Sequence, residues 1–343
     1  MKATPSSRFS ARLSTPILVS LALVIAVGAA AGQETRCPPG GVLLGVGTVG
    51  LGLGHIPRVD GVRINVRDHC LDQVNGLHLT LWTPRGVTRG DVSVGGPVRG
   101  ATVGLLPAAG SIHGVGAGLV GIVTEGNLRG AFAGGIGIAG EGSIAGFQAA
   151  GVGLVSRGSI RGVQASGVGL VGDGGIQGVQ VAGVGLVSGS GIQGVQAAGI
   201  GLVSRGLIQG VQASGVGLVA EGRIRGVQAA GIGLVTDESL VGLQAAGVAL
   251  VANDTMTGVK AAGIRISAGT KIDGLTVTAY RTTTPALTGL AVAGWNDLGR
   301  QEGLAIGIYN RAEVLRGVQV GLLNRAENNR SALRLLPLVN ASF

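Results

Sequence analysis

The sequence predicts an all-β fold, a repeat β-solenoid with 14- to 16-residue coils, on the basis of composition and internal repetition. The 343 residues include 68 glycines, 45% are hydrophobic and only 2% are aromatic. Glycine at this density would cost a helix about 1 kcal/mol per residue relative to alanine, whereas the abundant Val and Ile favour a pleated sheet. The same apolar phrase also recurs at a fixed spacing, which is the signature of a repeat architecture.

The repeat is marked by glycines at a 16-residue spacing, here called the marker glycines. An aliphatic residue or Met lies two residues before each of them, and polar segments such as SRGS and AEGR separate the apolar phrases. Because Gly, Ser and Asp form turns, each unit is predicted to hold one or two short strands closed by a polar turn. The marker glycines are Gly114, Gly130, Gly146, Gly162, Gly178, Gly194, Gly210, Gly226, Gly242, Gly258 and Gly274, and a shorter, 14-residue spacing separates Gly289, Gly303 and Gly317.

Two β architectures can use such a unit. In a solenoid, each unit is one coil and equivalent residues stack at about 4.8 Å. In an up-and-down outer-membrane β-barrel, each unit is one strand, successive turns lie on opposite sides, and a bulky apolar band with aromatic girdles faces lipid. A barrel would therefore show two classes of turn that alternate every 32 residues, and the polar turns of this sequence show no such alternation. Both faces of the predicted strand also carry small residues in place of a bulky apolar band, which favours the solenoid. The barrel remains the alternative, and its best support is the terminal Phe343 after alternating apolar residues.

Glutamine occupies the second position after the marker glycine in seven successive units. Amides that repeat at strand spacing can form hydrogen bonds along the stack. We therefore expect a structural glutamine ladder, with a ligand-binding row as the alternative. Its members are Gln148, Gln164, Gln180, Gln196, Gln212, Gln228 and Gln244.

The N-terminus has the order of a secretory signal peptide, assigned to residues 1–31. A basic leader precedes the apolar stretch PILVSLALVIAV, and Ala29 and Ala31 are spaced for cleavage. We expect a capping segment with the first irregular repeats at 32–100, regular 16-residue repeats at 101–288, and 14-residue repeats with a C-terminal cap at 289–343. Charges are scattered and few aromatic residues are available to stack on bases, so nucleic-acid binding is not indicated.

The two cysteines, Cys37 and Cys70, are predicted to form a disulfide, because an exported protein enters an oxidising compartment. The loop of about 33 residues would contribute about 3 kcal/mol, and two free thiols are the alternative. The segment RDHCLD around Cys70, with His78 nearby, is the one cluster that suggests a metal or a nucleophilic cysteine. A disulfide-pinned cap is the preferred interpretation.

A dinucleotide-binding site is a further candidate. The segment GVGTVG, Gly45 to Gly50, matches G-x-G-x-x-G, and Asp68 stands near the distance of the acidic residue that such sites use. The motif requires a helix after the glycines, and LGLGHIPRVDG does not predict one. We therefore expect this match to be accidental.

The C-terminal repeats resemble those of bacterial cell-surface repeat proteins with the signature G-[LV]-Q-[IVA]-G-[LIV]-[LIVY]-N followed by a polar turn. The match is closest in GLAIGIYNRAE (Gly303 to Glu313) and GVQVGLLNRAE (Gly317 to Glu327), and VDGVRINV and VNGLHLTLW resemble the start of such proteins. The central block departs from the signature by inserting AG and losing the Asn. The resemblance implies an exported, surface-associated repeat protein and brings no catalytic residues with it.

The expected function is a structural or adhesive role at the bacterial cell surface or outer membrane, with the periplasm as another location. Acidic residues stand singly in the predicted turns, which does not indicate the paired carboxylates of a glycosidase. We predict no enzyme activity, no cofactor and no metal, and a surface or envelope partner that the sequence does not name. An outer-membrane pore is the alternative function and depends on the barrel.

Overall fold

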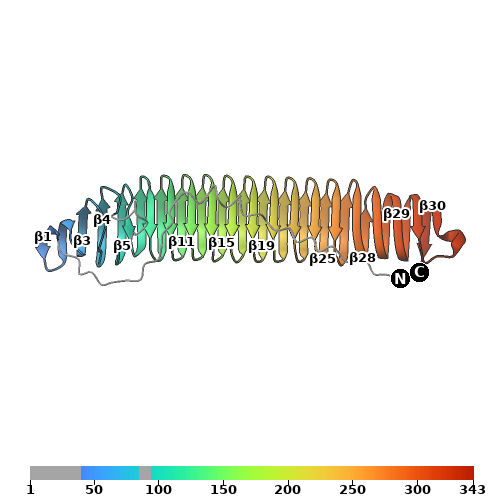
Figure 1. The fold of residues 1–343 in the computed structure, drawn as a ribbon, viewed down its shortest axis with the longest axis horizontal. Coiled ribbons are helices and arrows are strands. Elements are labelled where there is room, and N and C mark those ends of the chain that lie inside the picture. The colour runs from blue at the N-terminus through green and yellow to red at the C-terminus, as the bar shows by residue number, and fades with distance from the viewer. Residues whose placement is uncertain (1–39, 85–93) are drawn as a thin grey trace, which may run out of the picture.

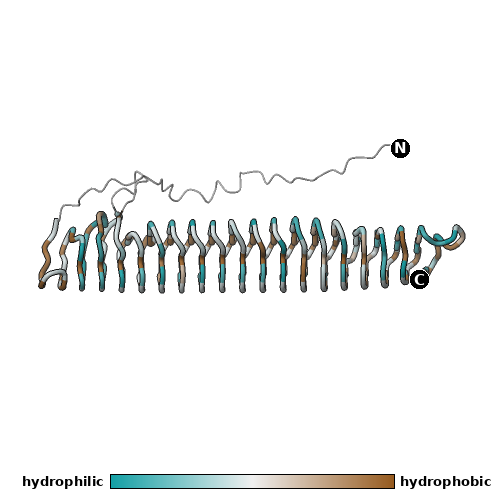
Figure 2. Tube along the Cα trace, turned by 90° about the horizontal axis from the view of Figure 1, so that it is seen from below, coloured by the Kyte–Doolittle hydropathy of each residue, from teal (hydrophilic) through white to brown (hydrophobic). Residues whose placement is uncertain are grey.

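The computed structural model describes residues 40–84 and 94–343 as one elongated rod. The strands lie across its long axis and follow one another along it in chain order (Figure 1). Seen at right angles, the coils stack side by side, and apolar and polar segments recur from coil to coil (Figure 2). The length of the molecule therefore follows from the number of repeats.

Each regular coil consists of one long and one short strand. The long strands are β9 (Leu128–Gly134), β11 (Ile144–Ala150), β13 (Ile160–Ser166), β15 (Ile176–Ala182), β17 (Ile192–Ala198), β19 (Ile208–Ser214), β21 (Ile224–Ala230), β23 (Leu240–Ala246), β25 (Thr255–Ala262) and β27 (Lys271–Thr278). The short strands are β8 (Gly121–Thr124), β10 (Gly137–Gly140), β12 (Gly153–Ser156), β14 (Gly169–Gly172), β16 (Gly185–Ser188), β18 (Gly201–Ser204), β20 (Gly217–Ala220), β22 (Gly233–Thr236), β24 (Ala249–Ala252) and β26 (Arg265–Ala268).

Neighbouring coils pair in parallel, long strand with long strand and short strand with short strand. Marker glycine Gly178 pairs with Gly162 in the preceding coil and with Gly194 in the following one. Leu186 of the short strand β16 likewise pairs with Leu170 and Leu202. This register confirms the predicted β-solenoid. The up-and-down barrel is wrong, because its neighbouring strands would be antiparallel and joined in succession.

The two ends of the rod depart from the regular coil. The N-terminal strands are β1 (Gly40–Val46), β2 (Val49–His55), β3 (Arg58–Asn65), β4 (Gln73–Thr80), β5 (Pro97–Gly104), β6 (Ala108–Ala109) and β7 (Ser111–Gly118). The C-terminal elements are β28 (Arg281–Val292), β29 (Trp295–Ala326), the 3₁₀ turn η2 (Ser331–Leu333) and β30 (Leu335–Ser342). Strands β1 and β30 pair antiparallel with β2 and β29, so an antiparallel strand lies at each end of the described stack.

The interior of a coil is narrow and is filled by a few side chains. In the coil that begins with β15, Ile176, Gln180, Ala182 and Leu186 are buried. The sequence places Gln, Ala and Leu on one face, as found. It also places Val184 on that face, but Val184 is 42% exposed because the chain bends there between the long and the short strand.

The marker glycines let neighbouring backbones approach closely. Gly178 has a φ of 112°, and a Cβ atom built on it would lie 2.2 Å from the carbonyl oxygen of Gly162. A side chain at this position would meet both an unfavourable φ and the backbone of the preceding coil. This double constraint explains why the repeat keeps glycine there.

Candidate functional site

The seven glutamines form a continuous hydrogen-bonded column inside the solenoid. Nε2 of Gln180 donates to Oε1 of Gln164 at 2.9 Å and to the carbonyl oxygen of Gln177 at 2.6 Å. The same links between glutamines join all six neighbouring pairs, at 2.7 to 2.9 Å. Each side chain is at most 4% exposed. An interior position leaves the column no surface on which to meet a ligand, so the alternative of a ligand-binding row has no geometric support.

The column ends at Lys260, which replaces glutamine in the next coil. Lys260 pairs with Gln244 in the sheet register and is 1% exposed. Its Nζ donates to the carbonyl oxygens of Thr257 at 2.5 Å and Gly242 at 3.0 Å. Burial lowers the pKa of Lys260 to about 8. The sequence register places a lysine in this row, but the glutamine pattern alone did not single it out.

A second buried polar group lies near the N-terminal end and centres on Asp68. Its carboxylate accepts hydrogen bonds from Arg63 Nη1 at 3.0 Å and Thr80 Oγ1 at 2.6 Å, and His78 Nε2 lies 2.9 Å away. Burial by itself would raise the pKa of Asp68, but the hydrogen bond and charge of His78, the hydroxyl of Thr80 and the charge of Arg63 hold that pKa well below its usual range. Arg63, Asp68 and His78 are 0% exposed.

This cluster is suited to holding the first coils together. Arg63 lies on β3, His78 and Thr80 on β4, and the backbone N–H of Ala108 also donates to the Asp68 carboxylate at 3.3 Å. The single acid thus joins three successive parts of the chain. Because solvent does not reach the group, it offers a ligand no accessible site.

The residues that the sequence suggested for metal or cysteine chemistry, around Cys70, do not form a metal or catalytic site in the part of the chain that the structure describes. Cys70 is disulfide-bonded, and its predicted partner, Cys37, lies outside the described residues, as does the predicted signal peptide. His69 of the RDHCLD segment stacks on His55, with ring centroids 3.8 Å apart. Among residues 40–84 and 94–343, no group of three His, Cys, Asp or Glu side chains could hold a metal ion.

The GVGTVG match forms a β-hairpin. Gly45 and Gly50 pair across the antiparallel strands β1 and β2, with the turn at Gly47 and Thr48. A pyrophosphate site requires the N-terminus of a helix directly after the glycines. The segment after Gly50 is strand β2, so this geometry does not form a dinucleotide site.

Charged side chains gather along one edge of the rod, in the polar turns that precede the long strands. Their row runs at the repeat spacing through Glu125, Glu141, Arg157, Asp173, Arg205, Glu221 and Asp237. Arg157 donates to Glu141 in the preceding coil at 2.7 Å. Both partners are partly exposed, so the pair contributes at most about 1 kcal/mol.

The outer face of the long strands carries two apolar rows beside a row of polar residues such as Gln193 and Gln209. One row, here called the valine ridge, consists of the outward residues that follow the marker glycines and are 40–52% exposed: Val163, Val179, Val195, Val211, Val227, Leu243 and Val259. Two residues further along each long strand lies a parallel row of exposed small residues. Because each outward row repeats at strand spacing, the apolar surface is continuous along the regular coils.

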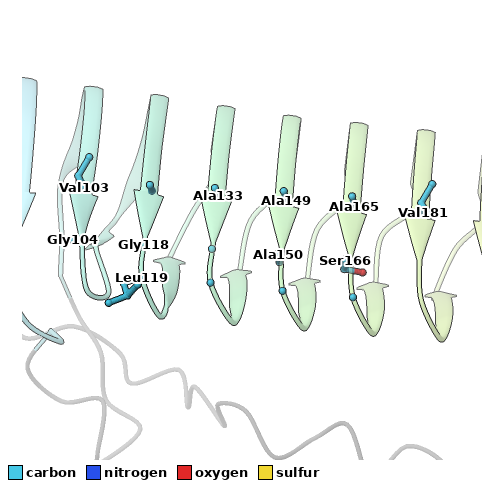
Figure 3. A pocket seen from close by; sticks show the side chains of 15 residues that line it. Val103, Gly104, Gly118, Leu119, Ala133, Ala149, Ala150, Ala165, Ser166 and Val181 are labelled. Carbon is cyan, nitrogen blue, oxygen red and sulfur yellow. The ribbon is translucent and has the colours of Figure 1, made fainter.

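The small residues form a shallow channel, here called the alanine groove, beside the valine ridge. Its first part has a volume of about 620 Å³ and runs between Val103 and Val181 over Ala117, Ala133, Ala149 and Ala165. Its second part, of about 650 Å³, runs from Val181 to Val277 over Ala197, Ala213, Ala229, Ala245 and Ala261. Figure 3 shows the first part, with the larger side chains of Val103 and Val181 at its two ends.

Comparison with known proteins identified no relative of this chain. The chain matches no protein-family model, no curated protein and no solved structure at the significance required. Within the described residues, no helix has the length and apolar character needed to cross a membrane. The geometry of the chain itself therefore carries the functional argument.

Proposed function

We propose that this protein is an exported, non-catalytic structural rod of the bacterial envelope whose apolar long-strand face attaches it to another surface. One observation carries the proposal: the valine ridge and the alanine groove form a continuous exposed apolar strip on a rigid scaffold. Large contiguous apolar patches on an exported protein mark interaction sites.

The interior supports a mechanical role for the scaffold. Stacked aliphatic side chains fill the coils, and hydrogen-bonded glutamines join seven of them, so that neighbouring coils support one another. The polar edge supplies charge for solubility on the opposite margin of the coil. The predicted leader at residues 1–31 and the resemblance of the C-terminal repeats to surface repeat proteins support export.

A pair of matched variants tests the proposal in the producing cells. Val195→Lys with Val227→Lys places two charges on the long-strand face, whereas Val203→Lys with Val235→Lys places them on the short strands of the same coils. The four valines are 50%, 47%, 39% and 41% exposed. Envelope fractions washed with neutral buffer at physiological salt should retain the wild-type protein and the short-strand variant and lose the long-strand variant.

Two results would contradict the proposal. A wild-type protein found only in the cytoplasm would exclude export, and equal retention of both variants would show that the apolar face does not hold the rod to the envelope. Circular dichroism of each purified variant controls for folding.

A further inference from the structure

We propose that the surface bound by the long-strand face is the same face of a second copy, so that two parallel rods pair through their valine ridges and alanine grooves. The inference rests on the proposed function, because it names the partner of the same apolar strip. It follows from three properties of the face: its shape, its charge and its area.

The shape is complementary to itself. The ridge and the groove are parallel rows two residues apart on every long strand, as Val227 and Ala229 are on β21. A two-fold axis that runs along the rod between the two rows exchanges them. It places Val227 of each copy over Ala229 of the other, and the same pairing recurs along the two rows because both repeat in the same register. In the coil of β15, Val179 of each copy faces Val181 of the other.

The next rows are also complementary under this operation. Outside the ridge lies a row of longer polar side chains, such as Gln193 and Gln209, and outside the groove lies a row of exposed glycines, such as Gly199 and Gly215. The same axis places each long polar side chain over a glycine of the partner. Large residues thus face small ones across four rows, which is the interdigitation seen in dry interfaces between stacked sheets.

Charge does not oppose the pairing. The valine ridge and the alanine groove contain no charged residue between Val163 and Val277, although Ser166 and Ser214 help to line the groove. The charged residues of the flanking row on β9 to β27 are Arg129, Arg161, Arg225 and Asp273. Under the two-fold axis, Arg225 of one copy faces Gly231 of the other and not a second arginine. A strongly charged partner would find no counter-charge on this strip.

The area is large enough for a stable dimer. Seven long strands, β13 to β25, carry the valine ridge. At about 4.8 Å per strand and about 23 Å per seven-residue strand, the footprint is about 770 Å² per copy. Stable protein interfaces bury about 800 Å² on each partner.

Sedimentation velocity of the purified mature protein over a range of concentrations tests the pairing. We expect a dimer at micromolar concentrations. Val227→Lys should weaken the dimer by more than about a hundredfold, because it buries a charge against Ala229 of the partner. Val235→Lys on the short strand of the same coil is the matched control and should leave the dimer unchanged.

Two further variants separate ridge-in-groove packing from general stickiness, because the two mechanisms predict opposite signs. Ala229→Val fills the groove and should weaken the dimer by about tenfold, although it adds apolar surface. Val181→Ala removes the one large residue that divides the groove and should tighten the dimer, although it removes apolar surface. Val181 is 51% exposed, so this change should leave the fold intact.

The outcomes distinguish this inference from the proposed function. A wild-type protein that is monomeric at about 100 μM, or an Ala229→Val variant that dimerises more tightly, would overturn the pairing. If such a protein still depends on the long-strand face for envelope retention, the proposed function stands with a different partner. A dimer that is absent from the envelope supports the pairing and contradicts the proposed function.

Discussion

Lys260 occupies the position in its coil that Gln244 holds in the coil before it, and the hydrogen-bonded column of glutamines ends between them. The Nζ of Lys260 donates to backbone carbonyls, and Oε1 of Gln244 has no hydrogen-bond partner among the described residues. In the column, Nε2 of each later glutamine donates to Oε1 of the glutamine before it as well as to backbone carbonyls, whereas the hydrogen bonds of the Lys260 ammonium group go to the carbonyl oxygens of Gly242 and Thr257. The replacement therefore interrupts the column at one defined coil.

Lys260→Gln should extend the column and stabilise the protein at neutral pH. The pKa of Lys260 in the folded protein, about 8, lies below its ordinary value of 10.5. The buried charge therefore destabilises the folded state at and below about pH 8, and this penalty disappears as the pH rises from about 8 to about 10.5. We expect Lys260→Gln to add up to about 3 kcal/mol at pH 7 and little at pH 10.5.

Thermal unfolding midpoints of both proteins at pH 7, 9 and 10.5 measure this difference. The gap should narrow as the pH rises. A gap that stays constant with pH would show that the ammonium group keeps its ordinary pKa of 10.5 and stays hydrated in the folded protein.

Replacing a glutamine in the middle of the column should lower the free energy of unfolding more than replacing the first glutamine. Gln196→Leu removes two links and leaves Oε1 of Gln180 unpaired in the interior, whereas Nε2 of Gln212 keeps the carbonyl oxygens of Gly194 and Gln209 as acceptors. Gln148→Leu removes a single ladder link, because Gln148 has a glutamine neighbour on one side only. Each unpaired buried group costs about 1 to 3 kcal/mol. Denaturant unfolding should therefore rank Gln196→Leu as clearly less stable, and equal effects would mean that packing and not hydrogen bonding governs this row.

The marker glycines should tolerate no side chain, while other glycines of the same coil should. Gly194 has a φ of 112°, and its Cβ would lie 2.2 Å from the carbonyl oxygen of Gly178. We expect Gly194→Ala to cost about 3 kcal/mol or more. Gly201→Ala is the control, because its Cβ would lie 3.2 Å from the nearest atom, Gly217 O, and Ala249 already stands in that row. A thermal midpoint equal for the two variants would contradict the role given to the positive φ.

The spacing of the repeat predicts the coil but not its cross-section. Sixteen-residue periodicity requires equivalent positions of neighbouring coils to stack. Because alternate residues of a strand point to the same face, Gln180, Ala182 and Leu186 are expected inside the coil together, and all three are buried. The division into strands of seven and four residues could not be predicted, because Gly183 and Gly185 on either side of Val184 offer the chain several places to bend. The apolar outer face follows from the same parity, since Val179 and Val181 alternate with Gln180.

The Asp68 cluster was beyond prediction for a different reason. Its members come from coils of unequal length, because the interval from Gly61 to Gly76 is shorter than the regular repeat and the interval from Gly76 to Gly100 is much longer. No fixed period aligns Arg63 with His78 until the pairing of β3 with β4 is known. The sequence did indicate the segment that contains Asp68, but for metal or cysteine chemistry.

Asp68→Asn should destabilise the first coils by about 3 to 5 kcal/mol, because it leaves the guanidinium of Arg63 buried without its counter-charge. Since the pKa of Asp68 in the folded protein lies well below its ordinary value of 3.8, the stability that the wild-type carboxylate contributes is present above about pH 4 and is lost as the pH falls below it.

Asp72→Asn is the control. It breaks the exposed pair with Arg58, in which the Asp72 and Arg58 side chains are 58% and 55% exposed, and should cost less than about 1 kcal/mol. Hydrogen exchange of β3 and β4 amides at pH 7 should therefore accelerate strongly in Asp68→Asn and hardly in Asp72→Asn. Similar exchange in both variants would mean that packing around Val59 and Val74, and not the buried ion pair, holds the first coils in register.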